Sequence, residues 1–187
     1  LLVFLAISLL TDSVIDRSSY PWGFLYYRAY PESVLLPIGR PYATFLSKIF
    51  TFKHIDWEGY AFVGLTGTVG FLVLLYYFIS KLIKKQYHSA FTPKSEFFTL
   101  KLYFWISIIA LLYSFGIPFI LGFKWLIEYI GPLKQMRGIA RFSWIFYYVI
   151  NIYVFYLLWS LNKTKINKYL WIGLIVVSLS TLWYDAW

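Results

Sequence analysis

The sequence has 187 residues, of which 60% are hydrophobic and 13% are charged. Ordinary soluble domains carry about 25% charged residues, so this composition excludes a typical soluble domain. Several apolar runs reach about 20 residues, which is the length that crosses a bilayer as a helix, and they lack the alternation of a transmembrane barrel. The composition therefore predicts an all-α, polytopic helical transmembrane bundle with interfacial helices.

The net charge is +9 and the sequence contains no cysteine. In a soluble protein such a charge would favour nucleic acid, but here it belongs mostly to loop lysines, which set the orientation of a membrane protein. We therefore expect a lipid bilayer as partner and no nucleic acid. The lack of cysteine excludes disulfides and thiol chemistry within this sequence.

The chain begins with an apolar run, Leu1–Leu10, that is too short to span a bilayer. No basic region precedes it, so it does not resemble a secretory signal, and we interpret it as the end of a truncated transmembrane helix. Residues 1–187 are thus expected to be a partial transmembrane domain of a longer protein. Residues 11–59 follow as an aromatic, extracytoplasmic segment along the membrane surface. Its prolines forbid one continuous helix, so short helices are predicted around Phe24–Ala29 and Tyr42–Phe50.

Four transmembrane spans are predicted from the remaining apolar runs. Three glycines in the first span, Gly64, Gly67 and Gly70, are expected to let a neighbouring helix approach closely. Gly116 and Pro118 are expected to kink the far end of the second span. The spans are predicted at about residues 60–80, 97–121, 142–161 and 169–183, with a short interfacial helix at Phe123–Ile130.

The lysine-rich loops at residues 81–94 and 163–168 predict the orientation, because cytoplasmic loops are enriched in basic residues. With both loops in the cytoplasm, the four spans alternate consistently. All arginines then lie on the outer side, where the positive-inside rule disfavours them, which indicates a specific use or plain ion pairs. They are Arg17, Arg28, Arg40, Arg137 and Arg141.

The strongest functional pattern is the basic stretch before the third span. Gly131-Pro132 predicts the start of a new helix. At helical spacing, the following basic and aromatic residues share one face. Two interpretations remain open: basic side chains that reach lipid headgroups, or a site for an anionic substrate, since arginine binds phosphate through two N–H groups. The residues of this face are Lys134, Arg137, Arg141, Trp144, Tyr148 and Asn151.

A second pattern, Asp56-Trp57-Glu58, directly precedes the first span. Two carboxylates at this spacing can bind a divalent cation, or one can act as a base. The alternative is a solvated turn whose acids pair with Arg137 or Arg141. We expect Glu58 to lie within pairing reach of one of these arginines and Asp56 to face solvent. Loss of Glu58 should then reduce yield as well as activity, because it strands a cation.

No metal or other cofactor is expected from the remaining residues. His54 and His88 fall on opposite sides of the membrane in the predicted topology, so they cannot share a zinc ion. Neither histidine has a serine or aspartate partner that the sequence places beside it.

Two segments resemble bacterial multi-pass membrane proteins of the GT-C-like glycosyltransferase type. Residues 58–65 (EGYAFVGL) are similar to an E-G-x-x-Y-x-G-L segment of those proteins, and residues 137–144 (RGIARFSW) to an R-x-x-G-R-F-x-W segment. Ala140 departs from the second pattern, where glycine usually precedes the second arginine. The resemblance covers about residues 56–161.

The resemblance implies part of an integral membrane glycosyltransferase that takes a sugar from a polyprenyl-phosphate carrier on the extracytoplasmic side of a bacterial inner membrane. In that reading Arg137 and Arg141 hold the lipid phosphate, Trp144 and Tyr148 line the path of the prenyl chain or sugar, and Glu58 supports them. The catalytic acid of such enzymes lies in the first extracytoplasmic loop, which is expected before Leu1. A transporter of lipid-linked saccharides and a non-catalytic membrane subunit remain alternatives.

Overall fold

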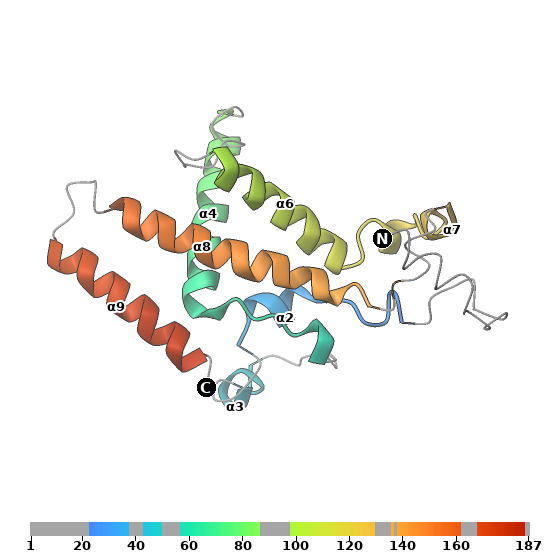
Figure 1. Cartoon of the computed structure of the whole chain (residues 1–187), viewed down its shortest axis with the longest axis horizontal. Coiled ribbons are helices and arrows are strands. Elements are labelled where there is room, and N and C mark those ends of the chain that lie inside the picture. The colour runs from blue at the N-terminus through green and yellow to red at the C-terminus, as the bar shows by residue number, and fades with distance from the viewer. Residues whose placement is uncertain are drawn as a thin grey trace, which may run out of the picture.

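The computed structural model describes residues 23–37, 43–49, 57–86, 98–129, 136, 138–161 and 168–185. Within these ranges the chain forms helices, turns and coil, and no strand. The predicted all-helical class is therefore confirmed. The α-helices, drawn in Figure 1, are α2 (Pro31–Leu35), α3 (Ala43–Leu46), α4 (Gly64–Ile83), α6 (Phe98–Ser114), α7 (Leu126–Tyr129), α8 (Ser143–Leu161) and α9 (Lys168–Asp185).

Two helical stretches in the described part of the chain are long and apolar enough to cross a membrane, namely α4 and Ala140–Ser160, which contains most of α8. Only 6% of the apolar stretch of α4 and 28% of the second stretch is buried inside the protein, so neither resembles the core helix of a soluble domain. Large outward-facing apolar surfaces need an apolar surrounding. These two helices therefore favour a membrane location.

The main core lies between α6 and α8, which run side by side (Figure 1). Phe104 on α6 packs its ring on Tyr153 of α8, with 4.9 Å between the ring centroids. Further along the same contact, Phe146 and Ile150 of α8 are fully buried. At the other end of the pair, Tyr113 near the end of α6 packs on Phe142, with centroids 4.9 Å apart. This contact holds the start of α8 beside the end of α6.

Helix α4 crosses α8 at small residues. A Cβ atom added to Gly70 would overlap the side chain of Val154, and one added to Gly67 would lie 3.2 Å from Oδ1 of Asn151. The side-chain amide of Asn151 donates hydrogen bonds to the carbonyls of Val63 (3.0 Å) and Tyr147 (2.9 Å). The close helix approach predicted from the glycines of α4 is therefore confirmed.

Helix α9 packs on the first turns of α4 through polar groups. The hydroxyl of Thr66 hydrogen-bonds to the hydroxyl of Thr181 (2.7 Å) and donates to the carbonyl of Ser178 (3.2 Å). The Leu65 N–H donates to Oδ2 of Asp185 at 2.7 Å. Since the first N–H groups of a helix have no partner within it, Asp185 caps α4 from the end of α9. We call Thr66, Asn151, Ser178, Thr181 and Asp185 the polar seam.

Residues 23–37 pack against the ends of the long helices. Their backbone groups bond to three separate elements: the Ala29 N–H to Ser114, the Val63 N–H to Val34, and the Ala140 N–H to Tyr27. Val34 is fully buried. These backbone bonds tie residues 23–37 to the ends of the long helices, and the position of this segment along a membrane surface stays a prediction.

One of the two short helices predicted in this region was displaced. Residues 24–29 form turns and coil, and the helix begins instead at Pro31, whose fixed φ suits the first helical position. Helix α3 falls within the predicted Tyr42–Phe50 segment. Residues 1–22, including the predicted truncated helix at 1–10, lie outside the described residues.

Helices α4, α6, α8 and α9 lie at the positions of the four predicted spans, but α4 begins at Gly64 and not near residue 60, and α6 ends early. Helix α6 ends at Ser114, not near Leu121, because Gly116 has φ +89 and turns the chain. The predicted break at Gly116 is therefore present, but the chain beyond it forms the 3-10 turn Phe119–Leu121 and does not continue the α-helix. Similarly, the helix predicted at Phe123–Ile130 is reduced to α7, and turns precede it.

Candidate anion-binding site at the start of α8

The chain approaches α8 through a 3-10 turn, Ala140–Phe142. Two hydrogen bonds fix this turn: the Ala140 N–H donates to the carbonyl of Tyr27 (3.0 Å), and the hydroxyl of Ser143 donates to the carbonyl of Ala140 (2.6 Å). Ala140 and Ser143 are fully buried. The side chain between them, Arg141, consequently faces outward and is 69% exposed.

Arg141 forms an ion pair with Glu58, which lies in the 3-10 turn Trp57–Gly59 before α4. Nη2 of Arg141 donates to Oε1 of Glu58 at 2.7 Å, and the glutamate side chain is only 20% exposed. The predicted pairing of Glu58 with an outer arginine is confirmed for Arg141. Asp56, the other carboxylate of that pattern, lies outside the described residues.

The Glu58 carboxylate lies against Gly138. A Cβ atom at Gly138 would lie 2.9 Å from Oε2 of Glu58 and 3.2 Å from Cβ of Tyr27. Glu58 thus lies close to Gly138 and is paired with Arg141. This contact of Gly138 could not be predicted, because its two neighbours, Glu58 and Tyr27, come from segments far away along the chain.

Two exposed aromatic residues, Trp144 and Tyr148, follow Arg141 along α8. Their ring centroids are 6.2 Å apart, and the ring of Tyr147 contacts both of them. Phe146 and Ile150, which alternate with them, are buried against the core. Trp144 and Tyr148 therefore lie together on an exposed side of α8, and Arg141 is exposed in the turn that precedes this helix.

The helical face predicted from Lys134 onward does not extend as expected. Met136, Gly138 and Ile139 are not helical, and the Ala140 N–H is bonded to Tyr27 instead of to a carbonyl one turn earlier. The prediction of one helix starting at Pro132 was therefore wrong for these residues. Lys134 and Arg137 themselves lie outside the described residues.

Asn151 was predicted on the same face, but it is turned toward α4, where it bonds to Val63 and lies against Gly67. It belongs to the helix contact and not to the exposed site. Arg28 also lies elsewhere: its guanidinium stacks on the ring of Tyr30 at 5.0 Å, and its side chain passes Gly116.

The chemistry available at this site is anion binding. A guanidinium has five N–H donors. Within the described part of the chain, Arg141 uses one nitrogen, Nη2, to donate a hydrogen bond to Glu58. Donors therefore remain for a phosphate or carboxylate. Among the residues that the structure describes, no group of three or more histidine, cysteine or acidic side chains is placed to hold a metal ion.

No family model matches the chain, and no curated protein or solved structure is similar enough to it to count as a match.

Proposed function

We propose that this chain is part of an integral membrane glycosyltransferase of the GT-C-like type, which uses a polyprenyl-phosphate-linked sugar on the extracytoplasmic side of a bacterial inner membrane. The observation that carries the proposal is the exposed guanidinium of Arg141, paired with Glu58 at the head of an apolar helix. In a lipid phosphate the charged group lies at one end of a hydrocarbon chain. In this protein the charged side chain of Arg141 likewise lies at one end of an apolar helix.

In this proposal Arg141 binds the lipid phosphate through the N–H groups that Glu58 leaves free. Trp144 and Tyr148, exposed one and two turns further along, line the path of the prenyl chain or sugar. Lys134 and Arg137, from the adjoining stretch, add positive charge. The catalytic acid is expected outside these residues, and no cofactor is required of them.

The fixed position of Arg141 favours a specific phosphate over general contact with lipid headgroups. A side chain that only meets headgroups needs charge and reach, which lysine supplies as well as arginine. Here a glutamate that is 20% exposed holds the guanidinium at 2.7 Å. Such preorganisation by a supporting residue is what an oriented binding site needs.

The substitution Arg141→Lys in the full-length protein tests this proposal. Lysine keeps the charge but cannot bind phosphate through two parallel N–H groups. We expect the turnover of lipid-linked sugar to fall at least about tenfold, because a hydrogen bond to a charged group contributes about 1.5–3 kcal/mol. Arg28→Lys, on an arginine that stacks on Tyr30, is the matched control and should retain activity. Wild-type turnover in Arg141→Lys at equal membrane levels would refute the phosphate role.

Binding can be measured separately from turnover. The purified full-length protein should bind a polyprenyl phosphate more tightly than the polyprenol without its phosphate, and Arg141→Lys should reduce that difference. Equal binding of the two lipids would refute the site. Phosphate-dependent binding without sugar transfer would instead favour the carrier of lipid-linked saccharides.

A further inference from the structure

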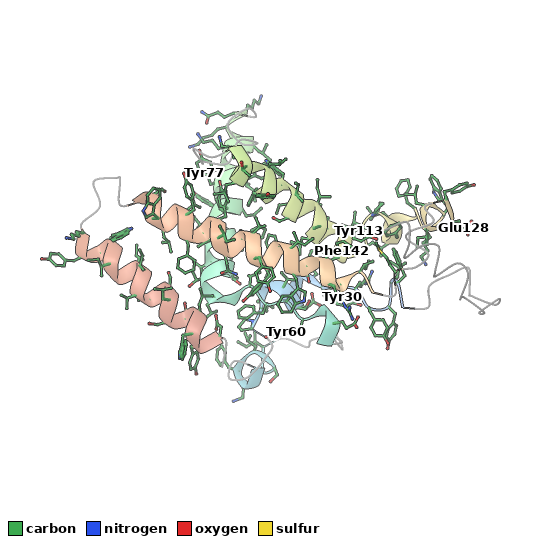
Figure 2. All side chains as sticks on the ribbon, in the orientation of Figure 1. Tyr30, Tyr60, Tyr77, Tyr113, Glu128 and Phe142 are labelled. Carbon is green, nitrogen blue, oxygen red and sulfur yellow. The ribbon has the colours of Figure 1, made fainter. Side chains whose placement is uncertain are left out.

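The loop between α6 and α8 carries a group of exposed apolar side chains. It begins with the 3-10 turn Phe119–Leu121, ends with α7, and lies at the edge of the protein, away from α4 and α9 (Figures 1 and 2). Rings along it contact each other, with centroids 6.4 Å apart for Phe123 and Trp125 and 5.8 Å apart for Trp125 and Tyr129. The exposed apolar members are Ile120, Leu121, Phe123, Trp125 and Tyr129.

These side chains are held outward by the fold of the loop. Two turns in the loop are closed by backbone hydrogen bonds. The Leu121 N–H donates to the carbonyl of Pro118, and the Ile127 N–H donates to the carbonyl of Lys124. Gly122, with φ +100, allows the sharp reversal between them. On the inner side, Phe119 is 2% and Ile127 is 0% exposed. The outward orientation is therefore built into the loop, since two buried side chains anchor it.

The depth of the loop follows from its packing. Phe119 and Ile127 pack in one cluster with Phe24 and Ile139. Ile139 directly precedes Ala140, where the apolar stretch that is long enough to cross a membrane begins. The exposed side chains of the loop therefore lie at the level where this stretch starts, and not near its middle.

The composition of the loop matches that level. Tryptophan and tyrosine are enriched where hydrocarbon meets water, because their rings are apolar and carry one polar group. Lys124 and Glu128 are exposed on the same loop, and Figure 2 shows Glu128 at its outer end. Charged side chains at this level reach the headgroups, whereas deep in hydrocarbon they are costly.

A second copy of the chain is a less suitable partner for this surface. A stable interface takes about 20–30 residues from each partner, whereas the loop offers five large apolar side chains with two charges among them. We propose that the loop Phe119–Tyr129 is a membrane anchor, which inserts its exposed side chains between the headgroups and upper acyl chains of the leaflet where α8 begins. This inference does not rest on the proposed glycosyltransferase activity.

The 187 residues contain no cysteine, so an introduced cysteine is the one labelling site within them, and any cysteine elsewhere in the full-length protein is first replaced by serine. Leu121→Cys, Trp125→Cys and Tyr129→Cys would each be labelled in the full-length protein and reconstituted in vesicles of phosphatidylethanolamine and phosphatidylglycerol. We expect collisions with oxygen, which concentrates in the bilayer, to exceed collisions with a water-soluble nickel complex at all three positions. Glu128→Cys is the control on the same loop and should favour nickel.

Two other results would overturn the anchor. Nickel accessibility at all of the apolar positions, equal to that at Glu128, would show that the loop faces water. Low accessibility to both reagents together with spin–spin broadening would show that a second copy covers it. Each of the three positions has an exposed side chain, so the failure of one variant to fold leaves two that decide the question.

Discussion

Two polar regions flank the starts of α4 and α8, and they use their polar groups in opposite ways. In the polar seam, the hydroxyls of Thr66 and Thr181 and a carboxylate oxygen of Asp185 bond to other parts of the chain. At the start of α8, by contrast, the Arg141 guanidinium bonds to Glu58 and stays 69% exposed. The first region uses its donors inside the protein, whereas the second keeps donors available.

This difference separates structural polar residues from candidate binding residues. A donor or acceptor bonded within the protein stabilises a contact between helices, because leaving a polar group unpaired in an apolar surrounding is costly. An exposed charge held by one partner contributes little to stability. Changes in the seam should therefore affect folding, and changes at the start of α8 should affect ligand binding.

The largest effect is expected where α4 and α8 touch. Gly70→Ala would place a methyl group onto Val154, and the resulting overpacking should destabilise the protein by about 1–3 kcal/mol. Thermal unfolding of the purified protein in detergent would measure the change. The double variant Gly70→Ala with Val154→Ala removes the overlapping methyl groups and should recover most of the loss. An unchanged unfolding temperature in Gly70→Ala would show that the two helices are not packed as described.

The next effect is expected at the cap of α4. Asp185→Ala removes the acceptor for the Leu65 N–H, and loss of a helix cap costs about 1 kcal/mol. The unfolding temperature should fall, with little change in phosphate-dependent lipid binding by the protein that remains folded. Ser180→Ala, at an exposed position on the same helix, is the control. Equal unfolding temperatures for both variants would argue against the cap.

The positions of the long helices could be predicted because they depend on local apolar runs. Their ends could not, since they depend on contacts between distant segments. Helix α6 ends where Gly116 reverses the chain, and the stretch before α8 stays non-helical where Ala140 bonds to Tyr27. Tyr27 cannot be read from the sequence before α8, whereas Gly116 is a local signal from which a bend, but not the end of the helix, was predicted.

A smaller effect on stability is expected for Glu58→Gln. Sequence reasoning expected lower yield because a cation would be stranded, but Arg141 is 69% exposed and stays solvated. The cost should be below about 1 kcal/mol, as for other exposed ion pairs. Lipid binding should weaken by no more than about fivefold, equivalent to about 1 kcal/mol, because the guanidinium loses the partner that orients it. A large loss of folded protein with intact lipid binding would show that Glu58 serves stability and not ligand binding.

Gly138→Ala should have the smallest effect. The new methyl group would press on Oε2 of Glu58 and on Tyr27, and the end of the glutamate side chain can move by a few tenths of an ångström. The unfolding temperature should change little, and lipid binding should weaken less than in Glu58→Gln. If Gly138→Ala weakens binding more than Glu58→Gln does, Gly138 acts on more than the glutamate.

The candidate site could be predicted only where local sequence patterns indicate it. The pairing of Glu58 with Arg141 could be expected because both residues border an apolar run on the same predicted side of the membrane. The contact of Glu58 with Gly138 and the cap by Asp185 could not be predicted, because each joins segments with no shared sequence pattern.

The bond between Leu65 and Asp185 joins residues that are 120 positions apart. A ribosome makes α4 long before it makes α9, so the start of α4 lacks this acceptor while α6 and α8 are being synthesised. A chain released after α8 would expose both the Leu65 N–H and the hydroxyl of Thr66 on an otherwise apolar helix. The cap on Leu65 and the contact of Thr66 with Thr181 can therefore form only after α9 has been synthesised.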